Sequence, residues 1–176
     1  MRRKTTVAML LAAMCLGVVA YVPVLQGQSN SGQSEVQIGF DIAPVHLELQ
    51  GKNRGLVGEG SYYVNGPSDC LGCHSGPNGY LSGGVPFGTA PNQVFSRNLT
   101  PDRFGRPAGL TFAEFEQVIR LGTDYKPTLF PPGGPLVVMP WPAYRHGTDH
   151  YVRALYEYLS SIPCIEGGPG SPANRC

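Results

Sequence analysis

The sequence is poor in charged side chains and shows no excess of either sign. Charged residues make up 14% of the 176-residue chain, with 13 Lys and Arg against 12 Asp and Glu. No basic stripe with interleaved aromatic residues is present, which argues against a nucleic-acid-binding protein. The sequence also lacks a catalytic-triad pattern, paired acid–base carboxylates and a glycine-rich phosphate loop. These absences give no support to an enzyme.

Long apolar runs are also absent, except for one at the start of the chain. Residues 7–25 are almost entirely apolar and follow Arg2, Arg3 and Lys4. This order is typical of a secretory signal peptide, and a membrane anchor is the alternative because the run is nearly long enough to span a bilayer. We therefore assign residues 1–25 to a signal peptide or membrane anchor and expect an exported protein, periplasmic or otherwise extracytoplasmic.

Glycine and proline, by contrast, are abundant, with 24 and 17 residues. Many of them fall in two stretches, residues 76–91 and 126–142, which we expect to be long loops. Loops of this length are uncommon in a small domain unless something other than the polypeptide organises them. A large, flat, apolar cofactor would do so by supplying core surface that the side chains lack.

Three segments carry helix signals. Residues 56–64 form a short predicted helix. Residues 111–122 begin with the capping box T-F-A-E, in which Thr111 is the cap, and end at a glycine. Residues 149–161 place apolar side chains on one side and follow the candidate cap Thr148.

The segment before the first helix is expected to be extended. Apolar residues alternate with others at Val36, Ile38, Phe40 and Ile42, which predicts a strand with one buried face. Residues 26–54 are therefore interpreted as a linker and an extended lead-in.

Four cysteines remain once the first 25 residues are set aside. Idle thiols tend to pair in an oxidising compartment, and Cys164 and Cys176 enclose a flexible tail. A disulfide between them would hold this tail, residues 164–176, to the end of the last helix and would contribute about 2–3 kcal/mol through loop entropy. Two unpaired thiols are the alternative.

Cys70, Cys73 and His74 form the motif C-L-G-C-H. A zinc site would need further ligands, and no second close pair of cysteines is present. His146 and His150 are four residues apart, but they flank the expected start of the last helix, where Thr148 should be the cap. A redox dithiol should lie at a helix start after a strand, whereas here a predicted helix precedes the motif and a loop follows it. C-x-x-C-H is the attachment signature of haem c, in which each thiol adds to one vinyl group and the histidine becomes the proximal iron ligand. The motif therefore predicts one covalently attached haem.

Met139 is the candidate for the second axial ligand of the iron. It is the only methionine after residue 14, and Pro140 and Pro142 stiffen the chain beside it. A thioether ligand favours Fe(II) and raises the reduction potential. Core packing is the alternative role for this methionine. His146 and His150 are rival ligands that would lower the potential.

The succession of motifs resembles that of the class I monohaem cytochromes c. Within that family the chain is most similar to the haem domains in the cytochrome subunits of bacterial membrane-associated alcohol and aldehyde dehydrogenases. The resemblance is carried by CLGCH, by NLTPD at residues 98–102, by MP after a Pro/Gly-rich loop and by the ending ALYEYLSSIP. Two features depart from it. The dehydrogenase subunits carry three such haem domains, whereas this chain has one motif, and the cysteine tail is not part of the general pattern.

This resemblance implies an all-α, small cytochrome c fold with long Gly/Pro-rich loops wrapped around one covalent haem. Residues 55–163 are the expected cytochrome c domain. Its first and last helices should cross at small residues, with Gly60 against Leu155 and Tyr158 as the candidate crossing.

The resemblance also bears on residues around the haem. Arg97, Trp141 and Tyr144 are candidate hydrogen-bond donors to the haem propionates, with ordinary packing or surface roles as the alternative. Asn98 begins a glycosylation sequon, N-L-T, for which we prefer a haem-packing loop as the explanation.

The sequence thus predicts an exported protein that transfers single electrons, with iron ligated by His74 and Met139. Its partners would be a dehydrogenase, an oxidase or another cytochrome. The protein would act either as a free electron shuttle or as a fixed subunit of a complex. The alternative is a haem protein with a bis-histidine or open distal site, acting in gas binding or peroxidase-like chemistry. A structural zinc module is a further class, which would give a colourless protein.

Overall fold

The computed structural model describes residues 34–91, 93–125, 135–167 and 174–176. They belong to one compact unit, Gln33–Cys176. The predicted signal peptide or anchor, most of the linker and part of the loop at residues 126–142 lie outside the described residues. Within the described part of the chain, no helix has the length and apolar character needed to cross a membrane.

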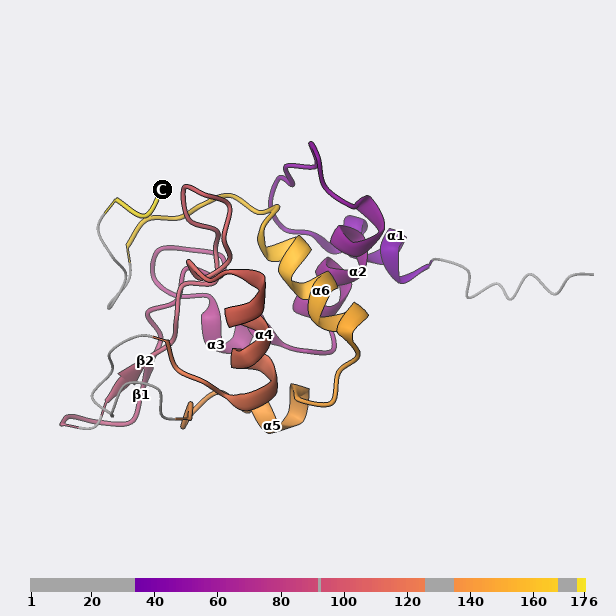
Figure 1. The fold of residues 1–176 in the computed structure, drawn as a ribbon. Helices are drawn as coiled ribbons and strands as arrows, with labels where there is room; N and C mark the ends of the chain where they lie inside the picture. The colour runs from indigo at the N-terminus through magenta and orange to yellow at the C-terminus, as the bar shows by residue number, and fades with distance from the viewer. Residues whose placement is uncertain (1–33, 92, 126–134, 168–173) are drawn as a thin grey trace, which may run out of the picture. The chain divides into compact units, whose positions relative to one another are not determined.

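The regular secondary structure of the described residues is mostly helical, with one small sheet, which confirms the predicted all-α class (Figure 1). The sheet pairs β1 with β2 antiparallel, Pro86 opposite Phe95. The helices and strands are α1 (Glu35–Ile42), α2 (Arg54–Asn65), α3 (Cys70–His74), β1 (Pro86–Phe87), β2 (Val94–Phe95), α4 (Phe112–Leu121), α5 (Trp141–Tyr144) and α6 (Asp149–Leu159).

The three predicted helices are present as α2, α4 and α6. The capping box of α4 is confirmed, since Thr111 accepts from the backbone amide of Glu114 and the Glu114 carboxylate accepts from the Thr111 amide at 2.8 Å. Gly122 ends α4 in the left-handed conformation, with φ of 68°. Thr148 caps α6 as expected, and α6 ends at Leu159, two residues earlier than predicted.

The predicted strand at residues 36–42 is wrong, because these residues form α1. Ser34 caps the helix by accepting from the backbone amide of Gln37 at 3.2 Å. The sequence S-E-V-Q carries this signal, since Ser followed three residues later by Gln is a helix-start pattern. The apolar alternation fits a strand over so few residues, but the capped segment is helical and packs closely on α2, with Gly39 against Gly58.

Helix α2 packs between α1 and α6 through two glycines. A Cβ at Gly58 would lie 2.7 Å from the Val36 carbonyl oxygen of α1, and one at Gly60 would lie 2.6 Å from Cβ of Tyr158 in α6. Residues two apart on a helix point about 200° apart, so Gly58 faces α1 and Gly60 faces α6. The predicted contact of Gly60 with Tyr158 is confirmed. The other nearest atoms belong to the backbone of Ala154.

A buried apolar cluster joins α2, α4 and α6. It includes Val57, Phe115, Ile119, Val152 and Tyr158, each at most 4% exposed. The loops between α3 and α4 complete the domain, and they form much of the wall of the cavity described next.

Candidate functional site

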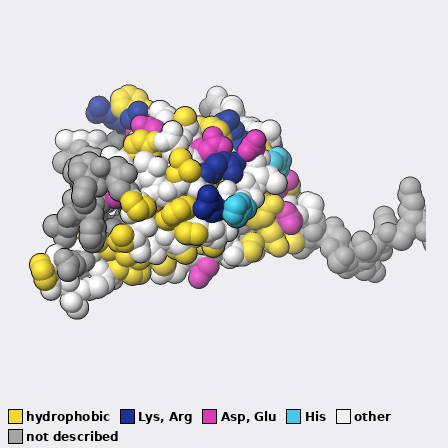
Figure 2. Space-filling view, turned by 60° about the horizontal axis from the view of Figure 1, so that its bottom comes forward, with side chains coloured by type: hydrophobic (Ala, Val, Ile, Leu, Met, Phe, Trp, Pro, Cys, Tyr) yellow, Lys and Arg dark blue, Asp and Glu magenta, His cyan; other side chains and the backbone are white. Residues whose placement is uncertain are grey.

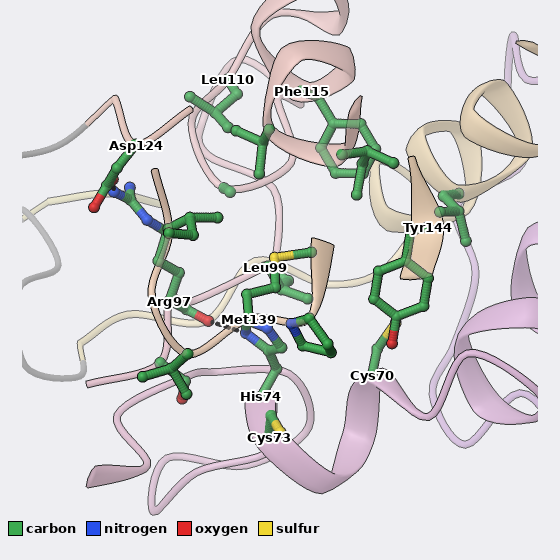
Figure 3. Close-up of a pocket in the computed structure, with 18 of the residues that line it drawn as sticks. Cys70, Cys73, His74, Arg97, Leu99, Leu110, Phe115, Asp124, Met139 and Tyr144 are labelled. Atoms are coloured by element: carbon green, nitrogen blue, oxygen red, sulfur yellow. Dashed lines mark hydrogen bonds and ion pairs between the residues drawn. The ribbon is translucent and has the colours of Figure 1, made fainter. Parts of the chain in front are cut away.

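A largely apolar cavity of about 300 Å³ lies beside this cluster. Its size is that of a small-molecule or cofactor site. Side chains of α2, α3, α4 and α6 line it, together with β1, β2 and the segment at residues 135–140. All four predicted site residues, Cys70, Cys73, His74 and Met139, lie in its wall (Figure 3).

Helix α3 places three of these residues on one face. Cys70, Cys73 and His74 are spaced i, i+3 and i+4, and residues at these spacings are neighbours on a helix surface. The two thiols are free rather than joined to each other. One short helix can therefore present both thiols and the imidazole to the same group.

His74 is held by a backbone carbonyl group. Its Nδ1 lies 2.7 Å from the carbonyl oxygen of Arg97. A carbonyl can only accept, so Nδ1 carries the proton and Nε2 keeps its lone pair. Burial lowers the pKa of His74, while the bond to Arg97 opposes this shift. The neutral imidazole with a free Nε2 is the form that binds a metal.

Cys70 does not have the character of a reactive thiolate. Burial, with further contributions from Asp69 and Cys73, raises the pKa of Cys70 to about 12. Dithiol oxidoreductases instead depend on a nucleophilic cysteine whose pKa is lowered. The place of Cys70 at the start of α3 agrees with one feature of a redox dithiol, but its raised pKa does not.

Met139 reaches the cavity from a different part of the chain, just before α5. Its backbone carbonyl accepts from the amide of Trp141 at 2.8 Å, which closes a tight turn around Pro140. Figure 3 shows the Met139 side chain and the His74 ring directed into the same hollow. The structure brings together a thioether and an imidazole that are 65 residues apart in the sequence.

The rival histidines do not line the cavity. His150, at the start of α6, pairs with Glu59 of α2 and remains largely exposed. His146 lies in the exposed turn after α5. Within the described residues, moreover, no group of three or more His, Cys, Asp or Glu could hold a metal ion.

Three residues were candidate donors to an anionic edge of a cofactor. Arg97 lines the cavity and forms an ion pair with Asp124 through Nη2, while its buried Nη1 has no hydrogen-bond partner among the described residues. Burial lowers the pKa of Arg97 to about 10. Tyr144 also lines the cavity, but its hydroxyl donates to the Ser68 carbonyl at 2.9 Å. Trp141 does not line it and packs against Gly122 instead.

The predicted sequon loop is buried. Asn98 is 2% exposed, and its side-chain amide donates to the Ile165 carbonyl oxygen at 2.8 Å. Its neighbour Leu99 lines the cavity. The Asn98 amide is thus engaged in the fold, as the preferred packing role requires, rather than presented at the surface.

One functional contact could not be found from the sequence. The group that orients His74 is the carbonyl of Arg97, and every residue type has such a carbonyl. The N-L-T-P-D motif beside it is the nearest signal, since it marks the loop but not the contact.

Exposed apolar side chains surround part of the cavity. Phe95, Val137 and Val138 line it and are 42–63% exposed as residues. Figure 2 shows hydrophobic side chains gathered over the lower part of one face, where few charged side chains lie.

Comparison with known proteins agrees with the motifs. The chain is 32% identical over 109 residues, 61% of its length, to the gluconate 2-dehydrogenase cytochrome c subunit of Pantoea cypripedii. It is 33% identical over 106 residues, 59% of its length, to the alcohol dehydrogenase (quinone) cytochrome c subunit of Komagataeibacter europaeus. It is 29% identical over 100 residues, 56% of its length, to the fructose dehydrogenase cytochrome subunit of Gluconobacter japonicus.

These relatives are cytochrome subunits of dehydrogenases. This confirms the predicted resemblance to the cytochrome subunits of dehydrogenases. No family model matches the chain. The alignments span only 23%, 21% and 20% of the three relatives, so the chain corresponds to a part of each.

Proposed function

We propose that this chain is an exported, single-haem c-type cytochrome that passes single electrons between redox partners. The observation that carries the proposal is that Cys70, Cys73, His74 and Met139 line one apolar cavity. The proposed domain is residues 55–163, and the proposed cofactor is one haem c.

The residues of the cavity fit this cofactor. Cys70 and Cys73 would hold it through two thioether bonds, and the free Nε2 of His74 and the sulfur of Met139 would be the two axial ligands. The unpartnered Nη1 of Arg97 is a donor that an acidic side group of the cofactor would satisfy. The haem supplies the Fe(III)/Fe(II) couple, a one-electron chemistry that this set of side chains does not itself provide.

The chain's own residues would hold the ligands and limit the access of water. The backbone carbonyl of Arg97 fixes the tautomer and orientation of His74. Apolar side chains of α4 and α6, such as Phe115 and Leu155, would keep water from the iron. With both axial positions filled, no substrate would bind the metal. The protein would therefore be an electron-transfer component rather than an enzyme.

The partners would be redox proteins. The relatives are subunits of dehydrogenases, which favours a dehydrogenase as electron donor and leaves an oxidase or another cytochrome as acceptor. The exposed apolar side chains Phe95, Val137 and Val138 would form a weakly charged contact surface beside the cavity, suited to brief association. Residues 1–25 would direct export and, if retained, would attach the protein to the membrane.

An optical spectrum tests the proposal. The full chain is expressed with haem-attachment machinery and measured oxidised and reduced, and covalent haem is detected by mass after denaturation. We expect a c-type reduced spectrum and the weak long-wavelength sulfur-to-iron band in the oxidised form. The variant Cys70→Ala/Cys73→Ala should lose covalent haem, whereas the matched Cys164→Ser/Cys176→Ser variant should keep it.

A second variant assigns the distal ligand. Met139→Ala should abolish the sulfur band, retain the covalent haem and allow CO to bind the reduced iron rapidly. Rapid CO binding to the unaltered protein would instead support an open distal site and gas-binding or peroxidase-like chemistry. A colourless protein under these conditions would refute the cytochrome assignment and bring back zinc or a dithiol.

A further inference from the structure

The C-terminal tail docks on the loop that holds His74. Beyond α6 it is described at residues 164–167 and 174–176. The Ile165 carbonyl accepts from the Asn98 side chain at 2.8 Å, and the Ile165 amide donates to the Thr100 hydroxyl at 3.1 Å. Both loop side chains are buried, Asn98 at 2% and Thr100 at 0% exposure. This half of the tail is therefore bonded to the segment directly after Arg97.

The other described half of the tail, residues 174–176, contacts the same loop after Arg97. Arg175 is 4% exposed, and its guanidinium donates to the Thr100 carbonyl. The carbonyl of Arg175 accepts from the amide of Arg103 at 2.8 Å. Cys164 and Cys176 pair with each other, which joins the two halves of the tail. The loop is thus bonded to both halves of a closed ring.

The tail also contacts the loop that follows His74. The Asn78 side chain donates to the Glu166 carbonyl at 3.2 Å. This loop is hydrogen-bonded to the Arg97 loop, from Leu99 to Leu81 and from Gly84 to Ser96, both at 2.9 Å. The tail therefore spans the two loops that enclose His74.

The peptide of Arg97 lies within this assembly. Gly83 approaches it so closely that a Cβ at residue 83 would overlap the Arg97 carbonyl group, which prevents a shift in that direction. Asn98, on the other side of the peptide, is held by Ile165 of the tail. The position of the Arg97 carbonyl, and with it the hydrogen bond to His74, depends on both neighbours.

We propose that the tail, closed by Cys164 and Cys176, is a brace that positions His74 as an axial ligand through the carbonyl of Arg97. The inference rests on the proposed function. A hydrogen bond from Nδ1 makes Nε2 a more basic ligand, and a more basic ligand favours Fe(III). Opening the ring loosens the loop that carries Arg97 and so weakens the hydrogen bond between His74 and the Arg97 carbonyl. The His74 ligand becomes less basic, and the reduction potential of the haem rises.

The test uses the full haem-loaded chain and the variant Cys164→Ser/Cys176→Ser. The first readout is the exchange rate of the His74 Nδ1 proton with solvent, measured by NMR on the reduced, ¹⁵N-histidine-labelled protein. The second is the reduction potential by voltammetry. We expect exchange to be faster by about tenfold, the effect of losing one hydrogen bond, and the potential to rise. Arg175→Ala, which keeps the cysteine pair, should shift both readouts in the same direction and serves if the double variant does not fold.

Thr148→Ala is the control, because it removes the cap of α6 and lowers stability without touching the tail. This variant shows how much faster the His74 Nδ1 proton exchanges through loss of stability alone. Its reduction potential should equal that of the wild type. The brace would be refuted if Thr148→Ala changed the exchange rate and the reduction potential as much as the tail variants do. It would also be refuted if both tail variants left the two readouts unchanged. A wild-type chain without covalent haem would overturn the proposed function and the brace together, so the two failures are distinguishable.

Discussion

The contact between α2 and α6 at Gly60 gives the sharpest prediction about stability. In an exposed helix position, Gly→Ala stabilises by about 1 kcal/mol through helix propensity. At Gly60 the new Cβ would lie 2.6 Å from Cβ of Tyr158 and would overlap the Ala154 carbonyl. Backbone and Cβ atoms cannot rotate away, so the two helices must separate. Such overpacking costs about 1–3 kcal/mol, and we expect the upper end here.

We therefore expect Gly60→Ala to lower the free energy of unfolding by about 2 kcal/mol after the gain in helix propensity. The assay is urea unfolding followed by far-UV circular dichroism. Gly55→Ala is the matched control, because it lies in the exposed first turn of α2, where a Cβ would meet only the Asn53 side chain at 3.3 Å. It should be neutral or stabilising. Equal stability changes in the two variants would refute the close helix contact.

Three further predictions concern the helix caps and the tail. Glu114→Gln should lower the free energy of unfolding by less than about 1 kcal/mol at pH 7, because the charged carboxylate favours the start of α4 but is screened by solvent. Hydrogen bonds from the backbone and hydroxyl of Thr111 lower the pKa of Glu114. The difference in free energy of unfolding between wild type and variant should therefore be present above about pH 4.5 and be lost as the pH falls through the folded-state pKa. Urea unfolding at several pH values measures it, and a pH-independent difference would contradict the prediction. Cys164→Ser/Cys176→Ser should cost about 3 kcal/mol in urea unfolding. A free-thiol assay on the denatured, haem-loaded wild-type protein should find none of Cys70, Cys73, Cys164 and Cys176 free, because the first two would be bound to the haem and the last two to each other. Ser34→Ala should destabilise α1 by about 1 kcal/mol, seen as faster amide exchange confined to that helix, and unchanged exchange would argue against the cap.

Local signals in the sequence were sufficient for the longer helices. The box formed by Thr111 and Glu114 and the glycine at residue 122 lie within one short segment, and each acts on its own neighbours. The same reasoning fails at α1, where eight residues satisfy both a helix and a strand pattern. The cap at Ser34 favours the helix, and the helix packs through Gly39 on Gly58, 19 residues away, a contact that no local pattern contains.

The candidate site divides in the same way. Cys70, Cys73 and His74 are adjacent in the sequence, so their shared face follows from the helix period alone. Met139 is predicted because it is the only methionine after residue 14 and because Pro140 and Pro142 stiffen the chain beside it, and the fold brings it to the same cavity. The carbonyl of Arg97 and the docking of Ile165 on its loop were not predictable, because both depend on backbone groups that carry no residue-specific signal.

Two segments outside the predicted domain at residues 55–163 pack on it, and they support different parts of the cavity. Helix α1 lies against the Gly58 side of α2, the helix that also contributes Val64 to the cavity wall. The tail instead is hydrogen-bonded to the irregular loops next to His74. Loops fixed only by a bound cofactor would lose their order without it. If the proposed brace holds, loops also fixed by a covalently closed tail would retain part of that order, and His74 and its carbonyl partner would be in position before the proposed cofactor binds.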